Sequence, residues 1–160
     1  ALAADAGPSR TCAVLASGGV RCWGNGTNGS LGDGRAQSSF TPVPVADLDS
    51  AVGVAVGDHH VCAVLADGTV RCWGQNELGQ LGSGSTTGPD DCGGDPCSMV
   101  PVEVPGLAGV RALAAGDDFT CALVAGGEVR CWGSARWTVV YTGQPFGPSP
   151  VRIPGFGSGA

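Results

Sequence analysis

The sequence predicts an all-β protein made of three consecutive repeats, each the size of a β-propeller blade. The pentapeptide Val-Arg-Cys-Trp-Gly occurs at 20–24, 70–74 and 129–133, and each copy lies within a longer repeated segment. Glycine and proline contribute 29 and 11 of the 160 residues and recur at fixed places between short runs of Val, Leu and Trp. A period of roughly 50 residues with several short strands in each unit is typical of a propeller blade.

The three units follow one another along the whole chain. We expect repeat 1 over 1–50, repeat 2 over 51–109 and repeat 3 over 110–160. Repeat 2 contains an insert at 83–98, and repeat 3 diverges from the other two over 134–148. The insert and the divergent loop are therefore the parts of the chain that the repeat does not explain.

Each unit reads as four strands. In repeat 2, an Ala/Val-rich run ends at the turn Gly57-Asp58, and runs rich in Val, Leu, Cys and Trp follow at 61–66 and 69–74. A run punctuated by prolines, at 100–105, completes the unit. Short apolar runs bounded by Gly, Pro and Asp are typical of strands. Because proline cannot donate to a β-ladder, we expect this last strand at the outer edge of its blade.

The second and third strands of each unit form a predicted hairpin that places two cysteines opposite each other. In repeat 2 the strands are joined through 66–68, Ala-Asp-Gly, which fits a type I turn closed by a left-handed glycine. A hairpin centred on Asp67 places Cys62 directly across from Cys72, and the same register holds in the other two units. Directly opposite residues on antiparallel strands have Cβ atoms about 4.5–5.5 Å apart, and modest adjustment reaches disulfide geometry.

The chain contains eight cysteines, and their even number and repeated spacing predict disulfides and an oxidising compartment. We expect three cross-strand pairs and one local pair in the insert, each contributing roughly 2–4 kcal/mol. The predicted pairs are Cys12 with Cys22, Cys62 with Cys72, Cys92 with Cys97, and Cys121 with Cys131. The expected location is therefore extracellular, at the cell surface or in a periplasm.

The charge balance argues against nucleic acid as a partner. The net charge is −6, and the chain contains arginine but no lysine. Contacts to phosphate need clustered cations, which the sequence lacks. No apolar run is long enough to insert into a membrane. The first residues also lack the basic start and long apolar centre of a targeting segment.

The second unit resembles a known repeat. Residues 63–82 read A-x-x-x-x-G-x-V-x-C-W-G-x-N-x-x-G-Q-L-G, which resembles the repeat of the regulator of chromosome condensation family. The resemblance covers all three units; it is strong in the second, good in the first and extends only to Gly133 in the third. It implies a β-propeller of four-stranded antiparallel blades, usually seven in a closed ring.

Three repeats are too few to close such a ring, so two arrangements stay open from the sequence. Either the chain is a section of a longer propeller, or copies associate head to tail, each completing its neighbour's sheets as a ring or a filament. A half-open array exposes flat blade faces and unpaired strand edges, which favours assembly. The expected partners are therefore another protein, further blades or further copies.

The recurring pentapeptide is interpreted as scaffolding. A feature that is copied into every unit is seldom one active site, and each cysteine has a partner. Alternation along the strand places Trp and Arg on one face. We expect the tryptophans in the core between blades, and the arginines paired with turn aspartates or stacked on Trp rings. These residues are Trp23, Trp73, Trp132, Arg21, Arg71, Arg130, Asp58 and Asp117.

Other motifs have simple structural explanations. The segment 76–82, N-x-x-G-Q-L-G, lacks the lysine and the following helix of a phosphate cradle, so its glycines are interpreted as turn residues. His59 and His60 are the only histidines, and no spacing of cysteines or carboxylates around them matches a metal site. We find no catalytic set and no cofactor motif, and we therefore expect no enzyme activity, cofactor or resident metal.

Two segments are candidates for contacts with a partner. The insert gathers carboxylates around two cysteines; the glycine placement does not match an EF-hand, so we expect a disulfide-pinned surface loop. The divergent loop of repeat 3 concentrates aromatic residues of the kind that anchor interfaces. The candidate residues are Asp90, Asp91 and Asp95 in the insert, and Arg136, Trp137, Tyr141 and Phe146 in the divergent loop.

These observations predict a non-catalytic, disulfide-containing propeller that acts by binding a protein or by structural assembly. The resemblance implies two alternatives. One is a secreted enzyme inhibitor, because the family includes propellers that block β-lactamases through face loops; the aromatics of repeat 3 would be the anchors. The other is guanine-nucleotide exchange on a small GTPase with chromatin binding, which the cysteine pairs and the acidic charge disfavour.

Overall fold

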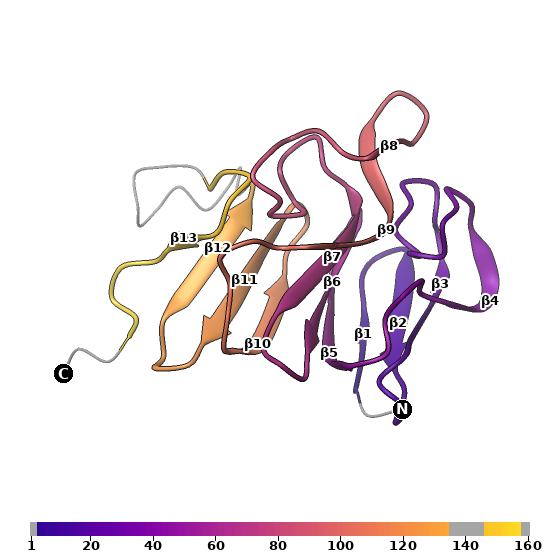
Figure 1. Ribbon diagram of the computed structural model, residues 1–160. Coiled ribbons are helices and arrows are strands. Elements are labelled where there is room, and N and C mark those ends of the chain that lie inside the picture. The colour runs from indigo at the N-terminus through magenta and orange to yellow at the C-terminus, as the bar shows by residue number, and fades with distance from the viewer. Residues whose placement is uncertain (1–2, 135–145, 158–160) are drawn as a thin grey trace.

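The computed structural model of the chain describes residues 3–134 and 146–157, which form strands and turns only. The strands build three antiparallel sheets, and each sheet contains one copy of the pentapeptide (Figure 1). We call the sheets blades 1, 2 and 3 in chain order. The predicted all-β fold of propeller blades is confirmed. The described ranges hold no helix of the length and hydropathy that crossing a membrane requires.

Blades 1 and 3 have the four expected strands in chain order, with the first and last strands at the two edges. The prolines of blade 1 lie in its outermost strand, as predicted for residues that cannot donate to a ladder. Blade 1 consists of β1 (Ala3–Ala6), β2 (Arg10–Val14), β3 (Val20–Gly24) and β4 (Ser39–Pro44). Blade 3 consists of β10 (Val110–Ala115), β11 (Phe119–Val124), β12 (Val129–Gly133) and β13 (Val151–Arg152).

Blade 2 has a fifth strand, which differs from the predicted four. Its strands are β5 (Ala51–Val56), β6 (His60–Leu65), β7 (Val70–Gln75), β8 (Asp90–Asp91) and β9 (Pro96–Glu103). The insert supplies β8, which pairs outside β9 and gives the spatial order β5-β6-β7-β9-β8. The reason is local: the insert turns back on itself within a few residues, so two of its residues extend the edge of the sheet.

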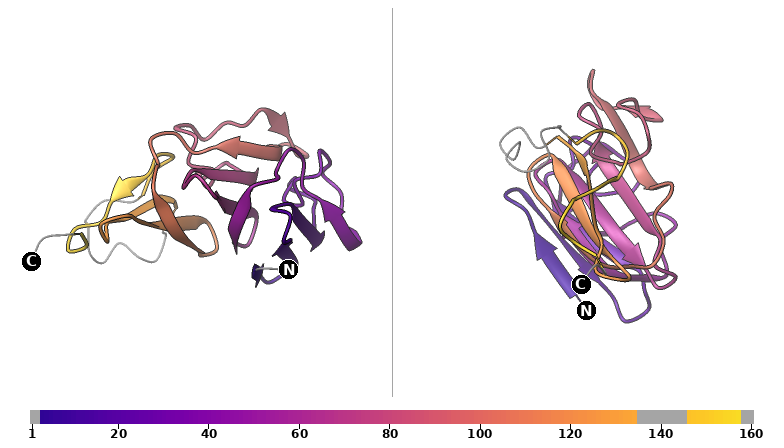
Figure 2. Two further views of the ribbon diagram at one scale, coloured as in Figure 1. Left: turned by 60° about the horizontal axis from the view of Figure 1, so that its bottom comes forward. Right: turned by 90° about the vertical axis from the view of Figure 1, so that its left-hand side faces the viewer.

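The first strand of each blade lies nearest a common axis. β5 contacts both β1 and β10, and the three sheets stand side by side in a curved row (Figure 2). Buried apolar side chains form one cluster between blades 1 and 2 and a second cluster between blades 2 and 3. The core therefore lies in the contacts between successive blades, which we call seams.

The loops gather at two ends of the blades. Asn25, which follows β3, donates its backbone N–H to the Ser9 carbonyl at 2.9 Å, and Gln75 makes the same bond to His59 at 3.0 Å. The turns after β1, β5 and β10 therefore share one end with the long loops after β3, β7 and β12. The insert belongs to this end, which we call the insert end. The hairpin turns and the links between blades lie at the opposite end.

The central hairpins have the predicted register. Each pairs its two cysteines directly, and a disulfide joins them with Cα atoms 4.1 Å apart in all three blades. Gly68 closes the blade 2 turn with φ 81° and donates its N–H to the Leu65 carbonyl at 2.9 Å. The predicted disulfides are confirmed: Cys12–Cys22, Cys62–Cys72, Cys121–Cys131 and, in the insert, Cys92–Cys97.

Alkylation of the unreduced protein is expected to label no cysteine, because all eight are paired. After reduction under denaturing conditions, the same reagent should label every cysteine. Mass spectrometry of the intact protein before and after reduction measures both states. Labelling of the hairpin cysteines without reduction would contradict the disulfide assignment and the oxidising compartment that it implies.

The predicted environment of the pentapeptide arginines is wrong. Arg21 is exposed and donates to the Pro42 carbonyl at 3.3 Å. Arg130 forms an ion pair with Glu128 of its own hairpin, and Arg71 is half-buried. These arginines lie on the third strand from the axis, and Arg21 also lies on a face of blade 1 that no other described blade covers. Their side chains therefore find partners in their own blade or solvent, and the turn aspartates lie near the axis.

Candidate functional site

Successive blades are joined at each seam by a buried tryptophan. Trp73 of blade 2 donates its Nε1–H to the carbonyl of Ser30 in blade 1 at 3.0 Å, and Trp132 of blade 3 donates to Gln80 of blade 2 at 3.0 Å. Both tryptophans have an exposed fraction of 0%. The expected position between blades is confirmed for these two. Trp23 lies on the outward face of blade 1 and is half-buried.

Loop glycines allow this close approach. A Cβ placed on Gly32 would lie 2.8 Å from Trp73 Nε1, which leaves no room for a side chain. The same loop also bonds forward, because Gly34 donates its N–H to the Met99 carbonyl of blade 2 at 2.9 Å. The glycines of the loop are thus structural, as predicted. The corresponding residues of the second seam are Gly82, Trp132, Gly84 and Pro148.

One position near the axis differs between the three blades. Arg10, His60 and Phe119 each begin the second strand of their blade, three residues after the glycine of the axial turn. We call these three the seam residues. Sequence analysis missed this position, although one signal was present: the residue changes from Arg to His to Phe while the cysteine two positions later is repeated in every blade.

Arg10 links blade 1 to blade 2 through backbone carbonyls. The side chain is 3% exposed. Its Nε donates to the Asn25 carbonyl at 3.0 Å, and its Nη1 donates to the carbonyls of Gly57 and Asp58. Burial lowers the pKa of Arg10, and the nearby Asp58 charge acts in the opposite direction. The guanidinium therefore joins the two blades near the axis through hydrogen bonds to backbone carbonyls.

His60 links blade 2 to blade 3 through a side chain. Its Nε2 lies 2.7 Å from the Thr120 hydroxyl, a hydrogen bond between two buried groups. Burial, with smaller contributions from the charges of Arg10 and His59, lowers the pKa of His60 to about 3. His60 is therefore neutral at physiological pH. Within the described residues, its Nδ1 has no hydrogen-bond partner.

In blade 3, Phe119 occupies the position that Arg10 and His60 occupy in blades 1 and 2. Its ring centroid lies 6.0 Å from that of Phe146 with the planes tilted by 54°. The blade 3 position is therefore apolar, and it brings Phe146 of the divergent loop to the insert end. The other predicted contact residues of this loop, Arg136, Trp137 and Tyr141, lie outside the described residues.

The insert is a hairpin held by hydrogen bonds to its aspartates, two through carboxylates and one through a backbone carbonyl. Asp90 Oδ2 accepts from the Met99 N–H at 2.9 Å, and Asp91 Oδ1 accepts from the Gly94 N–H at 2.7 Å. The Asp95 carbonyl accepts from the Cys92 N–H at 2.9 Å. The described part of the chain contains no group of three His, Cys, Asp or Glu side chains that could hold a metal ion. The insert is thus a loop at the insert end that is closed by the Cys92–Cys97 disulfide.

The axial turns surround a small hollow at the same end. Its volume is about 230 Å³, and turn residues of all three blades line it, among them Gly7, Gly57 and Gly116. Asp58 lines the hollow and pairs with His59, whose Nε2 lies 3.4 Å from its carboxylate. The two neighbouring histidines thus differ in exposure: His59 is partly exposed, and His60 is buried.

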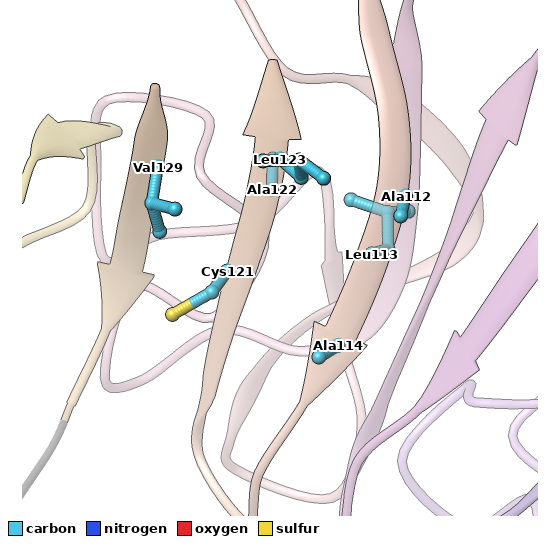
Figure 3. Close-up of a pocket in the computed structure, with 7 residues that line it drawn as sticks. All are labelled: Ala112, Leu113, Ala114, Cys121, Ala122, Leu123 and Val129. Carbon is cyan, nitrogen blue, oxygen red and sulfur yellow. The ribbon is translucent and has the colours of Figure 1, made fainter. Parts of the chain in front are cut away.

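The outward face of blade 3 carries an apolar hollow of about 310 Å³ (Figure 3). Side chains from β10, β11 and β12 line it, including Cys121, Leu123 and Val129. Leu123 is 41% exposed, although Val14, at the equivalent place in blade 1, is fully buried beneath blade 2. Blade 3 therefore presents the face that the next blade covers at both seams of this chain.

Comparison with known families explains these repeated contacts. Family models of the regulator of chromosome condensation (RCC1) repeat match residues 17–64 and 67–123, and a second model of the same repeat matches 3–30 and 51–80. The chain belongs to the RCC1 repeat family. No curated protein sequence matches it in a direct comparison.

Solved structures of RCC1-type propellers share the fold. Yeast RCC1 (Prp20), in its complex with Kap60, is 20% identical with a TM-score of 0.79 over 94% of this chain. Human WBSCR16 is 24% identical with a TM-score of 0.75 over 94%. A structure of Prp20p from Saccharomyces cerevisiae is 20% identical with a TM-score of 0.78 over 92%. The chain spans 36–37% of the length of these proteins.

Proposed function

We propose that the chain is a non-catalytic protein-binding section of an RCC1-type propeller, and that the insert end contacts the partner. The observation that carries this proposal is that the repeated residues have structural roles, whereas the unrepeated residues do not. The repeated cysteines, tryptophans and glycines are used by hairpins and seams. The unrepeated insert, on blade 2, and the Phe119–Phe146 pair, on blade 3, both belong to the insert end, where loops of a rigid scaffold commonly bind partners.

The compartment proposed is extracellular, at the cell surface or periplasmic. Four disulfides in 160 residues support an oxidising environment, because cytosolic thiols are kept reduced. The same disulfides disfavour the nucleotide-exchange and chromatin role implied by the family resemblance. Yeast Prp20p, whose binding to Gsp1p and histones has been described, shares the fold and supports a protein as partner.

A secreted enzyme inhibitor is the alternative within the same proposal. It would use the same end of the molecule, because the apolar Phe119 and Phe146 lie there with the stapled insert. An inhibitor needs a rigid loop with an aromatic anchor, which lowers the ordering cost on binding. The two roles differ only in whether the bound protein is an enzyme.

The experiment compares capture of proteins from culture fluid by wild type, an insert variant and a control variant. The insert variant D90N/D91N/D95N removes three charges but keeps oxygen acceptors for the Met99 and Gly94 N–H groups. The control D47N/D49N removes charges at the opposite end. We expect a partner that wild type and control retain and that the insert variant binds at least tenfold more weakly. Equal capture by all three proteins would refute the insert end as the contact surface.

The outward faces support a second candidate role, docking of further blades. The apolar hollow on blade 3 and the half-buried Trp23 on blade 1 are the two halves of a seam. Further blades of a longer chain would cover them, or second copies would do so head to tail in a ring or filament. Light scattering coupled to size-exclusion chromatography tests the second case, and a stable 15.7 kDa monomer would exclude head-to-tail assembly.

A further inference from the structure

We propose that mild acid opens the seam between blades 2 and 3 while the seam between blades 1 and 2 stays closed. Both seams contain a buried tryptophan, but the polar side chain that joins the blades near the axis is a histidine in one seam and an arginine in the other. Opening would separate Phe119 and Phe146 of blade 3 from the insert of blade 2. A change of partner binding in acid rests on the proposed function, whereas the opening itself does not.

The closed seam does not accommodate a protonated His60. The side chain is 0% exposed, and its Nε2 is bonded to the Thr120 hydroxyl. Its Nδ1 has no hydrogen-bond partner within the described residues and lies directly against Gly57, where a Cβ would be 2.6 Å away. Both ring nitrogens carry a hydrogen in an imidazolium, so protonation would bury a charge and leave an N–H without an acceptor.

The positive charges near His60 also disfavour its protonation. Burial is the largest reason that the pKa of His60 is lowered to about 3. The guanidinium of Arg10 in blade 1 and the imidazole of His59 in the same turn act in the same direction. A second positive charge at this place is therefore opposed from blade 1 and from blade 2.

The carboxylates of the axial turns do not compensate for these effects. Asp58 pairs with His59, which lies 3.4 Å away. In blade 3, Asp118 accepts from the Gln80 side-chain amide at 3.4 Å, and Asp117 lines the axial hollow. In the part of the chain that the structure describes, none of the three bonds to the buried ring. An imidazolium in the closed seam would therefore lack a counter-ion in contact with it.

The seam between blades 1 and 2 does not depend on a group that titrates in this way. Arg10 donates to the carbonyls of Gly57 and Asp58. A guanidinium stays protonated throughout the range in which histidine titrates. Asp5 of blade 1 adds a second polar contact, because its Oδ2 accepts from the Val56 N–H at 2.8 Å. Separation of blade 1 would also leave the histidine buried between blades 2 and 3.

Proton binding links acid to the opening of one seam. Opening exposes His60 to water, where a histidine binds a proton near pH 6.5. The open seam then binds more protons than the closed seam, so a fall in pH favours opening. From pH 7.5 to 5.0 this linkage raises the opening constant by about 30-fold. Blade 3 can separate alone, because the units of a repeat array are held by contacts with their neighbours.

Hydrogen exchange of the two seam indoles tests the proposal in the full chain. Trp132 Nε1–H is bonded to the Gln80 carbonyl across one seam, and Trp73 Nε1–H is bonded to the Ser30 carbonyl across the other. NMR measures the protection factor of each group, relative to a tryptophan peptide at the same pH, at pH 7.5 and 5.0. We expect the protection of Trp132 to fall by about tenfold or more and that of Trp73 to change by less than about threefold.

Two variants separate the contributions of the neighbouring histidines. H60Q keeps a donor for the Thr120 hydroxyl but cannot take up a proton, so the protection of Trp132 should be nearly the same at both pH values. H59Q should behave as wild type. Each protein is judged by the ratio of its own two protection factors, so a general loss of stability in a variant does not change the comparison.

Three results would overturn the proposal. Equal loss of protection at Trp73 and Trp132 in wild type would show that acid acts on the whole fold. Unchanged protection of Trp132 in wild type would show that the seam stays closed. A loss in H60Q as large as in wild type would assign the opening to another group. No partner takes part in these measurements, so their outcome is independent of the capture experiment at the insert end.

Discussion

Replacing Trp73 with alanine is expected to lower the free energy of unfolding by about 3–5 kcal/mol. The side chain is fully buried in the seam between blades 1 and 2, and its Nε1–H is bonded to the Ser30 carbonyl. The substitution removes a large buried apolar surface and leaves a cavity. It also leaves the Ser30 carbonyl without its hydrogen-bond donor. Urea denaturation at neutral pH measures the loss.

Trp23 provides a matched control for this experiment. It occupies the same place in the repeat, but it lies on the outward face of blade 1 and is half-buried. Trp23→Ala should therefore cost no more than about 1–2 kcal/mol. Equal losses at the two positions would mean that the seam does not hold the blades together and that the tryptophan acts within its own blade.

Acid is expected to destabilise the protein through His60 before most carboxylates titrate. The unfolded chain binds a proton at His60 near pH 6.5, but burial keeps the folded residue neutral down to a pKa of about 3. The unfolded state therefore binds more protons between these values, and stability falls as the pH is lowered. From pH 6.5 to 4.5 the expected loss is roughly 2–3 kcal/mol.

Two variants separate this effect from the other titrating groups. H60Q cannot take up a proton, so its stability should change little between pH 6.5 and 4.5. H59Q, at the partly exposed neighbour, should keep nearly the wild-type dependence. Urea midpoints of the three proteins at several pH values provide the measurement. If H60Q loses as much stability as wild type over this range, the acid sensitivity has another origin.

Local features of this fold could be predicted because they depend on residues close in sequence. The spacing of Cys62 and Cys72 around Asp67 sets the hairpin register, and the structure has that register. The position of Trp73 in a seam also follows from strand alternation together with the stacking of repeats. These predictions needed only the repeat and the pleat of a strand.

Features that depend on which blade faces lie against each other could not be predicted. Arg21 shares a face with Trp23, so alternation and the stacking of repeats placed it against a neighbouring blade, but no described blade covers that face and the side chain is exposed. The His60–Thr120 bond joins residues 60 positions apart. Nothing in the spacing of either segment indicates that contact; it follows from how two sheets lie against each other.

The placement of the disulfides has a mechanical consequence. All four close short loops within one blade, and none crosses a seam. When the chain is stretched from its two termini, the blades can therefore separate, but the residues inside each disulfide-closed hairpin cannot extend. Each such hairpin shortens the fully stretched chain by on the order of 30 Å at about 3.5 Å per residue. Under tension the blades would separate from one another first. The disulfide-bonded hairpins would stay closed after the blades had separated.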